Sequence, residues 1–137
     1  RNINELEELL QTLICQLCHY VEENRTSPAS QLIQKIQAYM QENYGDVDLT
    51  LTRVADQFNL TPNYLSIFFK ENAHDTFLNY LTRLRLEEAK RLMRDTRLSI
   101  TEISERVGYA SANSFTRAFK KIEHVTPTQY RESSVHS

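Results

Sequence analysis

The sequence predicts an all-α protein with two helix-turn-helix subdomains joined by a long helix and preceded by an N-terminal amphipathic helix. Three observations predict this fold. Only 2 glycines and 3 prolines occur in 137 residues, which favours helices over tight turns. A pattern of two short amphipathic helices around a turn occurs twice along the chain. A strongly apolar helical segment lies between the two copies.

A leucine-rich amphipathic helix and its linker are predicted for residues 1–30. Apolar residues in alternating steps of three and four form a heptad seam: Ile3, Leu6, Leu10, Leu13, Leu17 and Tyr20. An isolated helix of this length is marginal in water, so the seam needs a partner. Either it pairs with its twin in a second chain and forms a homodimer, or it packs on its own domain. Ser27 and Pro28 suit a helix start at the end of the linker.

A C-x-x-C-H motif lies in that helix: Cys15, Cys18 and His19. The same pattern attaches c-type haem. Haem attachment requires export, a second axial ligand and a pocket, which the sequence does not indicate. A redox pair would follow a strand, and zinc would need two further ligands. Ordinary reduced thiols are therefore favoured over a disulfide or a metal site, and we expect no metal and no cofactor.

The first half of the main domain, residues 31–75, is predicted to open with a helix over 31–44. Its apolar positions recur at helical spacing: Leu32, Ile33, Ile36, Tyr39, Met40 and Tyr44. Gly45 is predicted to end this helix as a C-terminal cap.

Two further helix starts are predicted in this half. Thr50 and Thr52 stand where a short helix begins, and Ser99 and Thr101 repeat this in the second half. They are predicted to cap these helices, at about 1 kcal/mol each, and free N–H groups there could also bind a phosphate. Thr61 and Pro62 open the candidate recognition helix as N-cap and first helical residue. The core contacts of this helix are predicted to include Tyr64, Leu65, Phe68 and Phe69.

A long connecting helix is predicted over residues 76–94. Its apolar residues lie on more than one side: Phe77, Leu78, Leu81, Leu84, Leu86, Ala89, Leu92 and Met93. About nineteen residues span roughly 28 Å, close to the ~34 Å between successive major grooves on one face of DNA. Arg83 and Arg85 either pair with Glu87, Glu88 or an acid of another helix, or contact phosphates.

The second half, residues 95–133, repeats the first. Residues 98–109 match 49–60, and residues 113–121 match 63–71, so the turn of the second copy is one residue longer. The apolar face of its two helices comprises Ile100, Ile103 and Val107, then Phe115, Ala118, Phe119 and Ile122. A repeat present twice is too short for a solenoid.

The opposite faces of the repeated helices carry groups that suit DNA. Base contacts are predicted for Asn63, Ser66, Ile67, Ala112, Asn113, Thr116 and Arg117. Phosphate contacts are predicted for Thr50, Thr52, Thr61, Lys70, Ser99, Thr101, Ser111, Lys120 and Lys121. Ile67 can pack on a thymine methyl, whereas Arg117 can bind guanine O6 and N7 together. The alternative for Arg117 is an ion pair with a carboxylate on its own surface.

Charge is unevenly distributed, although the net charge is only −2. Residues 1–30 are acidic, and between Arg83 and Lys121 basic residues outnumber acidic ones about two to one. A duplex needs only such a local basic face. The sequence has no phosphate-binding glycine loop and no nucleophilic triad, so we expect no catalytic residues and no enzyme. Neither a membrane span nor a signal peptide is recognisable, and this domain is expected to be cytoplasmic without membrane contact.

These motifs resemble those of the AraC/XylS-type DNA-binding domain. The pattern SITEISERVGY at 99–109, FKK at 119–121 and TPTQYR at 126–131 resembles its second half, VADQFNLTPNYLS at 54–66 its first half, and YLTRLRLEEAKRLM at 80–93 its connecting helix. The resemblance covers roughly residues 31–133. It implies two helix-turn-helix units joined by one long helix, with residues 134–137 left as a tail.

The resemblance implies sequence-specific binding of double-stranded DNA by a bacterial transcription regulator, with two recognition helices in successive major-groove segments. It also implies an upstream sensor or receiver domain, leaves open a membrane-embedded sensor elsewhere in the full chain, and allows RNA polymerase as a partner. The chain starts at Arg1 rather than at a methionine, which suggests a fragment. The alternative function is a helical protein-interaction module that couples a sensor to a partner without reading bases.

The sequence departs from the family pattern after each recognition helix. The family usually has glycine there, and this chain has His74 and His124. We expect slightly strained left-handed caps, since histidine tolerates positive φ better than most residues. Thr126 and Pro127 are predicted to start the last helix, with Tyr130 folding back onto the core and a frayed end over 132–137.

Overall fold

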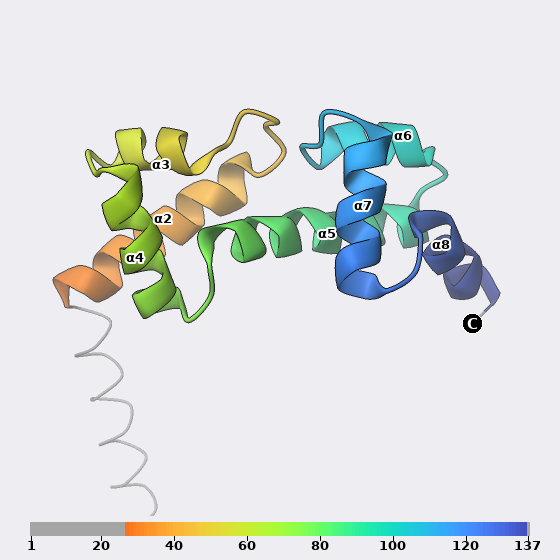
Figure 1. The fold of residues 1–137 in the computed structure, drawn as a ribbon. Coiled ribbons are helices and arrows are strands. Elements are labelled where there is room, and N and C mark those ends of the chain that lie inside the picture. The colour runs from red at the N-terminus through yellow and green to blue at the C-terminus, as the bar shows by residue number, and fades with distance from the viewer. Residues whose placement is uncertain (1–26, 137) are drawn as a thin grey trace, which may run out of the picture. The chain divides into compact units, whose positions relative to one another are not determined.

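The computed structural model describes residues 27–136, and within them the chain is entirely helical (Figure 1). The helices are α2 (Pro28–Asn43), α3 (Leu51–Gln57), α4 (Pro62–Ala73), α5 (Phe77–Asp95), α6 (Ile100–Arg106), α7 (Ala112–Glu123) and α8 (Pro127–His136). The predicted all-α class is thereby confirmed. The predictions for residues 1–26, namely the heptad helix, its dimer seam and the C-x-x-C-H motif, lie outside the described residues.

One compact unit, Ile36–Ser137, contains the last part of α2 and all later helices. The beginning of α2 belongs to a separate unit, Arg1–Lys35. Within the compact unit, α5 lies between a group made of α3 and α4 and a group made of α6, α7 and α8 (Figure 1). This is the predicted arrangement of two helix-turn-helix halves on one connecting helix.

The start of α2 follows from its cap, and its end differs from the prediction. The Ser27 hydroxyl accepts the N–H of Ser30 at 3.1 Å. The helix therefore begins at Pro28, three residues before the predicted start at residue 31. Helix α2 ends at Asn43, and Gly45 lacks the left-handed conformation that is usual for a glycine cap, since its φ is not positive. The side-chain amide of Asn43 instead donates to the carbonyl of Tyr39 at 2.8 Å. The lack of a side chain matters for another reason: an added Cβ would lie 3.0 Å from the Arg106 carbonyl oxygen, a contact tighter than most.

The core of the first half forms around Phe69, which is fully buried. Its ring packs edge-on against Phe77 and Tyr80 of α5, with ring centroids 5.8 and 5.4 Å apart. Other buried apolar residues of this core are Ile36, Met40, Leu49, Val54, Ala55, Leu65, Phe68 and Leu81. The first turns of α5 therefore belong to the first half.

The core of the second half uses the later turns of α5. Leu86, Ala89, Leu92 and Met93 form one buried cluster with Ile103, Val107, Phe115 and Phe119. Tyr130 of α8 packs on this cluster and meets the Phe119 ring at 5.5 Å, as predicted for the last helix. The two apolar sides of α5 thus bury against different halves, which explains its broad apolar surface.

Three apolar residues assigned to the core by the sequence are exposed instead. Tyr64, Leu78 and Ile122 expose 52%, 68% and 41% of their surface. Tyr64 stacks on Phe68 at 5.8 Å with its outer side in solvent.

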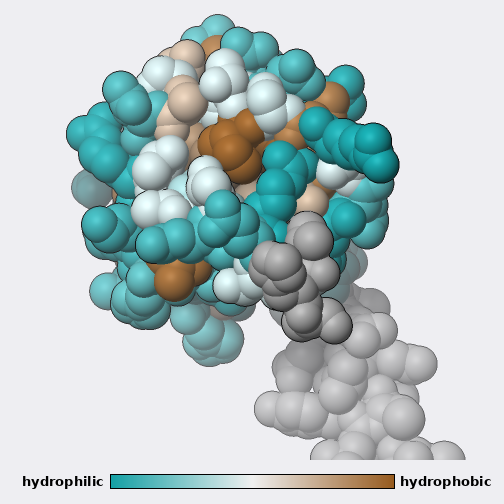
Figure 2. Space-filling view, turned by 90° about the vertical axis from the view of Figure 1, so that its right-hand side faces the viewer, coloured by the Kyte–Doolittle hydropathy of each residue, from teal (hydrophilic) through white to brown (hydrophobic). Residues whose placement is uncertain are grey.

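The face shown in Figure 2 is mostly hydrophilic, with hydrophobic side chains in separate small patches. Of the helices between residues 27 and 136, none combines the length and hydrophobicity needed to cross a membrane.

Helix ends follow the predicted chemistry at most positions. The side chains of Thr50, Thr61 and Ser99 accept N–H groups three residues on, at 3.2, 3.1 and 3.1 Å. Thr52 and Thr101 lie inside α3 and α6, so their predicted capping role is wrong. Helix α8 continues to His136, so most of the segment predicted to be frayed, 132–137, is helical.

Both recognition helices end in the predicted histidine caps. His74 has φ 59° and His124 has φ 67°, and their N–H groups donate to the carbonyls of Lys70 and Lys120. A non-glycine residue in this conformation is strained by about 1 kcal/mol.

We expect His124→Gly to raise the stability by about 0.5 kcal/mol, since relief of this strain exceeds the added freedom of the unfolded chain. Thermal unfolding followed by circular dichroism should show a Tm about 2–4 °C higher. Lys121→Gly, in the last turn of the same helix, should lower the stability, by at most the ~1 kcal/mol that glycine costs in a helix interior. A lower Tm for His124→Gly would show that the imidazole makes stabilising contacts that outweigh the strain.

Candidate nucleic-acid interface

The exposed face of α4 carries the base-contact residues predicted for the first half. Asn63, Ser66, Ile67 and Lys70 recur at helical spacing and are all exposed, Ile67 by 54%. Leu65 and Phe69 on the opposite face are fully buried and fix the rotation of the helix. The helix therefore presents one amide, one hydroxyl, one apolar group and one cation to solvent.

The face of α7 repeats this arrangement with different chemistry. Asn113, Arg117 and Lys120 are exposed, and Thr116 is half-buried. The burial of Phe115 and Phe119 turns them outward, as Leu65 and Phe69 do for α4. Ala112, also predicted at the base face, is half-buried in the first turn of α7. The N-cap of α7 is Ser111, whose hydroxyl accepts the N–H of Ser114 at 3.1 Å.

The cations of α7 are available to a ligand. In the part of the chain that the structure describes, Arg117, Lys120 and Lys121 form no ion pair with a carboxylate. The alternative prediction for Arg117, an ion pair with a carboxylate on its own surface, is therefore wrong. Three unpaired cations on consecutive turns of one helix give a local positive potential that attracts phosphates.

The predicted phosphate-contact residues lie at the helix starts and on the recognition helices. All nine are exposed: Thr50, Thr52, Thr61, Lys70, Ser99, Thr101, Ser111, Lys120 and Lys121. A cap satisfies one of the N–H groups in the first turn of its helix, and the remaining ones can donate to an anion. The threonines inside α3 and α6 offer hydroxyls instead.

The two arginines in the middle of α5 have different environments. Arg83 forms an ion pair, as predicted, but its partner is Asp75 in the turn before α5 rather than Glu87, Glu88 or an acid of another helix. Arg85 takes neither of its predicted roles. Its side chain is buried, with 9% exposed, and it donates to the backbone carbonyls of Tyr44 at 2.8 Å and Asp46 at 3.0 Å.

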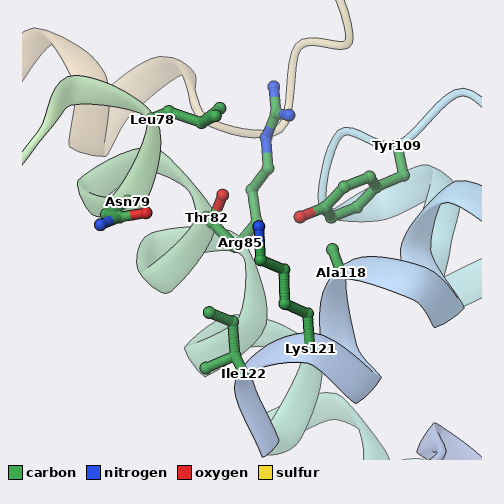
Figure 3. Close-up of a pocket in the computed structure, with 8 residues that line it drawn as sticks. All are labelled: Leu78, Asn79, Thr82, Arg85, Tyr109, Ala118, Lys121 and Ile122. Carbon is green, nitrogen blue, oxygen red and sulfur yellow. The ribbon is translucent and has the colours of Figure 1, made fainter.

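A groove of about 260 Å³ lies between α5 and α7 beside Arg85 (Figure 3). Its lining is Leu78, Asn79, Thr82, Arg85, Tyr109, Ala118, Lys121 and Ile122. Burial raises the pKa of Tyr109, while Arg85 and a hydrogen bond with Thr82 oppose this shift. Burial lowers the pKa of Arg85, and Tyr109 and Asp46 act in the opposite direction. The guanidinium stays charged because its ordinary pKa lies far above neutral pH.

An ion pair also ties the end of α7 to α5. Lys90 contacts Glu123, the last residue of α7, and Glu87 one turn earlier on α5 at 3.0 Å. Burial alone would lower the pKa of Lys90, but hydrogen bonds to Glu123 and Glu87 outweigh it and raise the pKa. The recognition helix is thus held at its C-terminal end, whereas its N-terminal face stays exposed.

The prediction from sequence missed Tyr64, which adds an exposed aromatic ring beside Asn63 on α4. A signal for it was present: the matching residue of the second copy is Ser114, which is polar. The role of Arg85 was missed too, although helical spacing carries a signal: Arg85 lies one turn from Leu81 and one turn from Ala89 on the buried side of α5.

Comparisons with known proteins agree with this geometry. The family model described as "Helix-turn-helix domain" matches residues 54–133. The HTH-type transcriptional regulator YijO of Escherichia coli K12 is 36% identical over 108 residues, which cover 78% of this chain and 38% of YijO. The chain spans less than half the length of the curated relatives it matches.

Two solved structures share both fold and sequence with it. The C-terminal domain of AraT, a response regulator from Geobacillus stearothermophilus, is 40% identical with a TM-score of 0.74, covering 80% of this chain and 88% of that one. The C-terminal domain of the two-component response regulator YesN from Fusobacterium nucleatum is 42% identical with a TM-score of 0.70, covering 77% and 99%. The family is one of DNA-binding regulators and not of enzymes. The chain belongs to the AraC-type helix-turn-helix family of transcription regulators.

Proposed function

We propose that this domain binds an asymmetric duplex site of nearly two helical turns, with α4 and α7 in successive major-groove segments on one face of the DNA. The observation that carries the proposal is the duplicated outward face. Asn63, Ser66, Ile67 and Lys70 on α4 correspond one by one to Asn113, Thr116, Arg117 and Lys120 on α7. Both faces are turned outward by buried aromatic or aliphatic residues.

Different chemistry at one matched position makes the site asymmetric. Ile67 offers a methyl-bearing surface that can pack on thymine, and Arg117 offers two parallel N–H donors that match guanine O6 and N7. The matched asparagines at 63 and 113 and the hydroxyls of Ser66 and Thr116 can bond to base edges in both halves. Ala112 adds a small apolar contact next to Asn113.

Phosphate contacts hold the two helices in register. The exposed lysines 70, 120 and 121 are proposed to neutralise phosphates directly. The hydroxyls and free N–H groups at the helix starts add uncharged contacts from Thr50, Thr52, Thr61, Ser99, Thr101 and Ser111. These contacts fix orientation and carry no base preference.

The wider protein is part of the proposal. AraT and YesN are response regulators whose C-terminal domains match this chain. We infer that a sensor or receiver domain precedes residues 31–133, that the regulator acts in the cytoplasm, and that RNA polymerase is a further partner. Pairing of two chains through the heptad seam at residues 3–17 would place two such domains on tandem or inverted sites.

The test is selection of bound sequences from a random duplex pool, followed by a salt titration on the selected site. We expect two base-specific segments about one helical turn apart. Three lysine contacts alone predict a slope of log affinity against log salt of about −2.7. Fluorescence anisotropy at several salt concentrations measures this slope. An unselected duplex of equal length is the control, and it should show weaker binding with a similar slope.

A helical protein-interaction module gives the opposite result. Its affinity for duplex DNA would be low at every salt concentration, and selection would return no common sequence. A single enriched segment would show that one recognition helix reads bases and would remove the second contact from the proposal.

A further inference from the structure

We propose that Arg85 is a positioning residue that fixes the spacing of the two recognition helices by joining the two halves of the domain. The inference rests on the proposed function, since it concerns how two half-sites are bound together. It assigns no base or phosphate contact to Arg85, whose side chain is buried.

The side chain leaves the middle of α5 and reaches the loop that joins α2 to α3 (Figure 3). There Nε donates to the Tyr44 carbonyl at 2.8 Å, and a terminal nitrogen donates to the Asp46 carbonyl at 3.0 Å. The same guanidinium lies 5.3 Å from the centre of the Tyr109 ring, which belongs to the turn of the second half. One planar cation, carried by the connecting helix, therefore contacts a loop of the first half and a ring of the second half.

The backbone is shaped to allow this contact. Gly108 has φ 100°, and a Cβ added there would lie 2.4 Å from the Tyr44 carbonyl oxygen and 2.8 Å from Arg85 Nε. A Cβ at Gly45 would meet the Arg106 carbonyl oxygen at 3.0 Å. Both glycines of the chain thus occur where the loop of one half approaches the backbone of the other.

The second half contains a related device that stays within that half. Arg131 of α8 donates to the carbonyls of Met93 at 3.2 Å, Thr96 at 3.0 Å and Leu98 at 2.6 Å, in the segment that leads into α6. Met93 and Tyr44 hold matching places in the two copies, so both arginines hold the same loop of the repeat. Arg85 differs because it also stacks on Tyr109 of the other half.

The physical consequence concerns the cost of binding two half-sites at once. Two linked modules gain affinity only if their separation matches that of their sites, and a fixed separation raises the effective concentration of the second. Arg85 holds the loop between α2 and α3 against the turn before α7. Loss of the Arg85 contacts leaves α5 as the main connection between the two halves. The distance between α4 and α7 then varies over a wider range.

The experiment compares two charge-conserving variants of the same helix, Arg85→Lys and Arg83→Lys. An ammonium cannot reproduce the forked donation of a guanidinium to two carbonyls, whereas the ion pair of the exposed Arg83 with Asp75 needs only one charged donor and tolerates lysine. Affinity is measured for each separate half-site, for the selected site, and for that site with about five base pairs inserted between its halves. Wild type and Arg83→Lys should prefer the selected spacing by roughly thirtyfold or more.

For Arg85→Lys we expect half-site affinities within about twofold of wild type and a preference for the selected spacing below roughly threefold. Full retention of the spacing preference would overturn the inference, as would equal losses on both half-sites and on the full site. If Arg85→Lys fails to fold, Tyr109→Leu replaces it, because it removes the ring under the guanidinium and leaves both carbonyl bonds in place. The same loss of spacing preference is expected for that variant, and its retention counts against the proposal.

A measurement without DNA separates this inference from the proposed function. Spin labels on cysteines placed at the exposed positions of Asn63 and Asn113, in a chain with Cys15→Ser and Cys18→Ser, report the distance between α4 and α7 by pulsed electron resonance. We expect a narrow distance distribution that broadens in Arg85→Lys and not in Arg83→Lys. Equal widths in all three proteins would refute the role of Arg85, even if no duplex were bound specifically.

Discussion

Replacing Arg117 with alanine is expected to weaken binding to the selected duplex by about 1–3 kcal/mol, or roughly 5- to 150-fold, and to abolish preference at one base pair. The side chain is exposed on α7 and has no carboxylate partner among the described residues. Binding therefore breaks no internal ion pair, and the guanidinium is free to fork onto a guanine. The measurement is anisotropy against the selected duplex and the three single-base replacements at the contacted position.

Lys120→Ala is the matched control for this prediction. Lys120 is exposed three residues later on the same helix, and its loss removes the same unit of charge. A phosphate contact carries no sequence information, so we expect this variant to weaken all four duplexes by the same factor and to reduce the salt slope by about 0.9. If Arg117→Ala also weakened all four equally, Arg117 would be a phosphate contact and the proposed base reading would be wrong.

The duplication explains how much of the fold could be predicted from sequence. Matched apolar residues such as Phe69 with Phe119 and Val54 with Ile103 are fully buried in both copies. Six large apolar residues of the described chain are exposed: Val47, Tyr64, Ile67, Leu78, Ile122 and Val125. Each has a polar counterpart in the other copy: Thr96, Ser114, Arg117, Thr128, Asn72 and Asp75. Helical periodicity placed three of the six in the core, whereas comparison of the copies identifies them as surface positions.

The contacts between the two halves could not be predicted from the sequence. Arg85 lies on the buried side of α5 and Arg83 on its exposed side, as helical spacing allows, but the carbonyl partners of Arg85 come from the loop after α2. Gly45 was interpreted through its local position after a helix, but its close neighbour is the Arg106 carbonyl, more than fifty residues away. Local propensity cannot show such contacts, because they depend on how two separately folded segments meet. The candidate DNA contacts could be predicted since they follow from the rotation of a single helix.

Phe119→Ala is expected to have the largest effect on stability, a loss of about 3–5 kcal/mol measured by chemical denaturation. The ring is fully buried and packs between Phe115 at 5.7 Å and Tyr130 at 5.5 Å, so its removal leaves a cavity lined by two stiff aromatic rings. Ile122→Ala, one turn later on the same helix, is the control. Because Ile122 is 41% exposed, its truncation should cost less than about 1 kcal/mol.

This loss is a large part of the ~5–15 kcal/mol that typically stabilises a domain. It should affect DNA binding indirectly, because Phe119 fixes the rotation of α7 and thereby the direction of Arg117. Phe69 occupies the matching place in the first half and is equally buried, so Phe69→Ala should cost a similar amount. A cost below about 1 kcal/mol for Phe119→Ala would show that α7 is held mainly by its ends, through its caps and the ion pair of Lys90 with Glu123. The packing of its buried face would then contribute little.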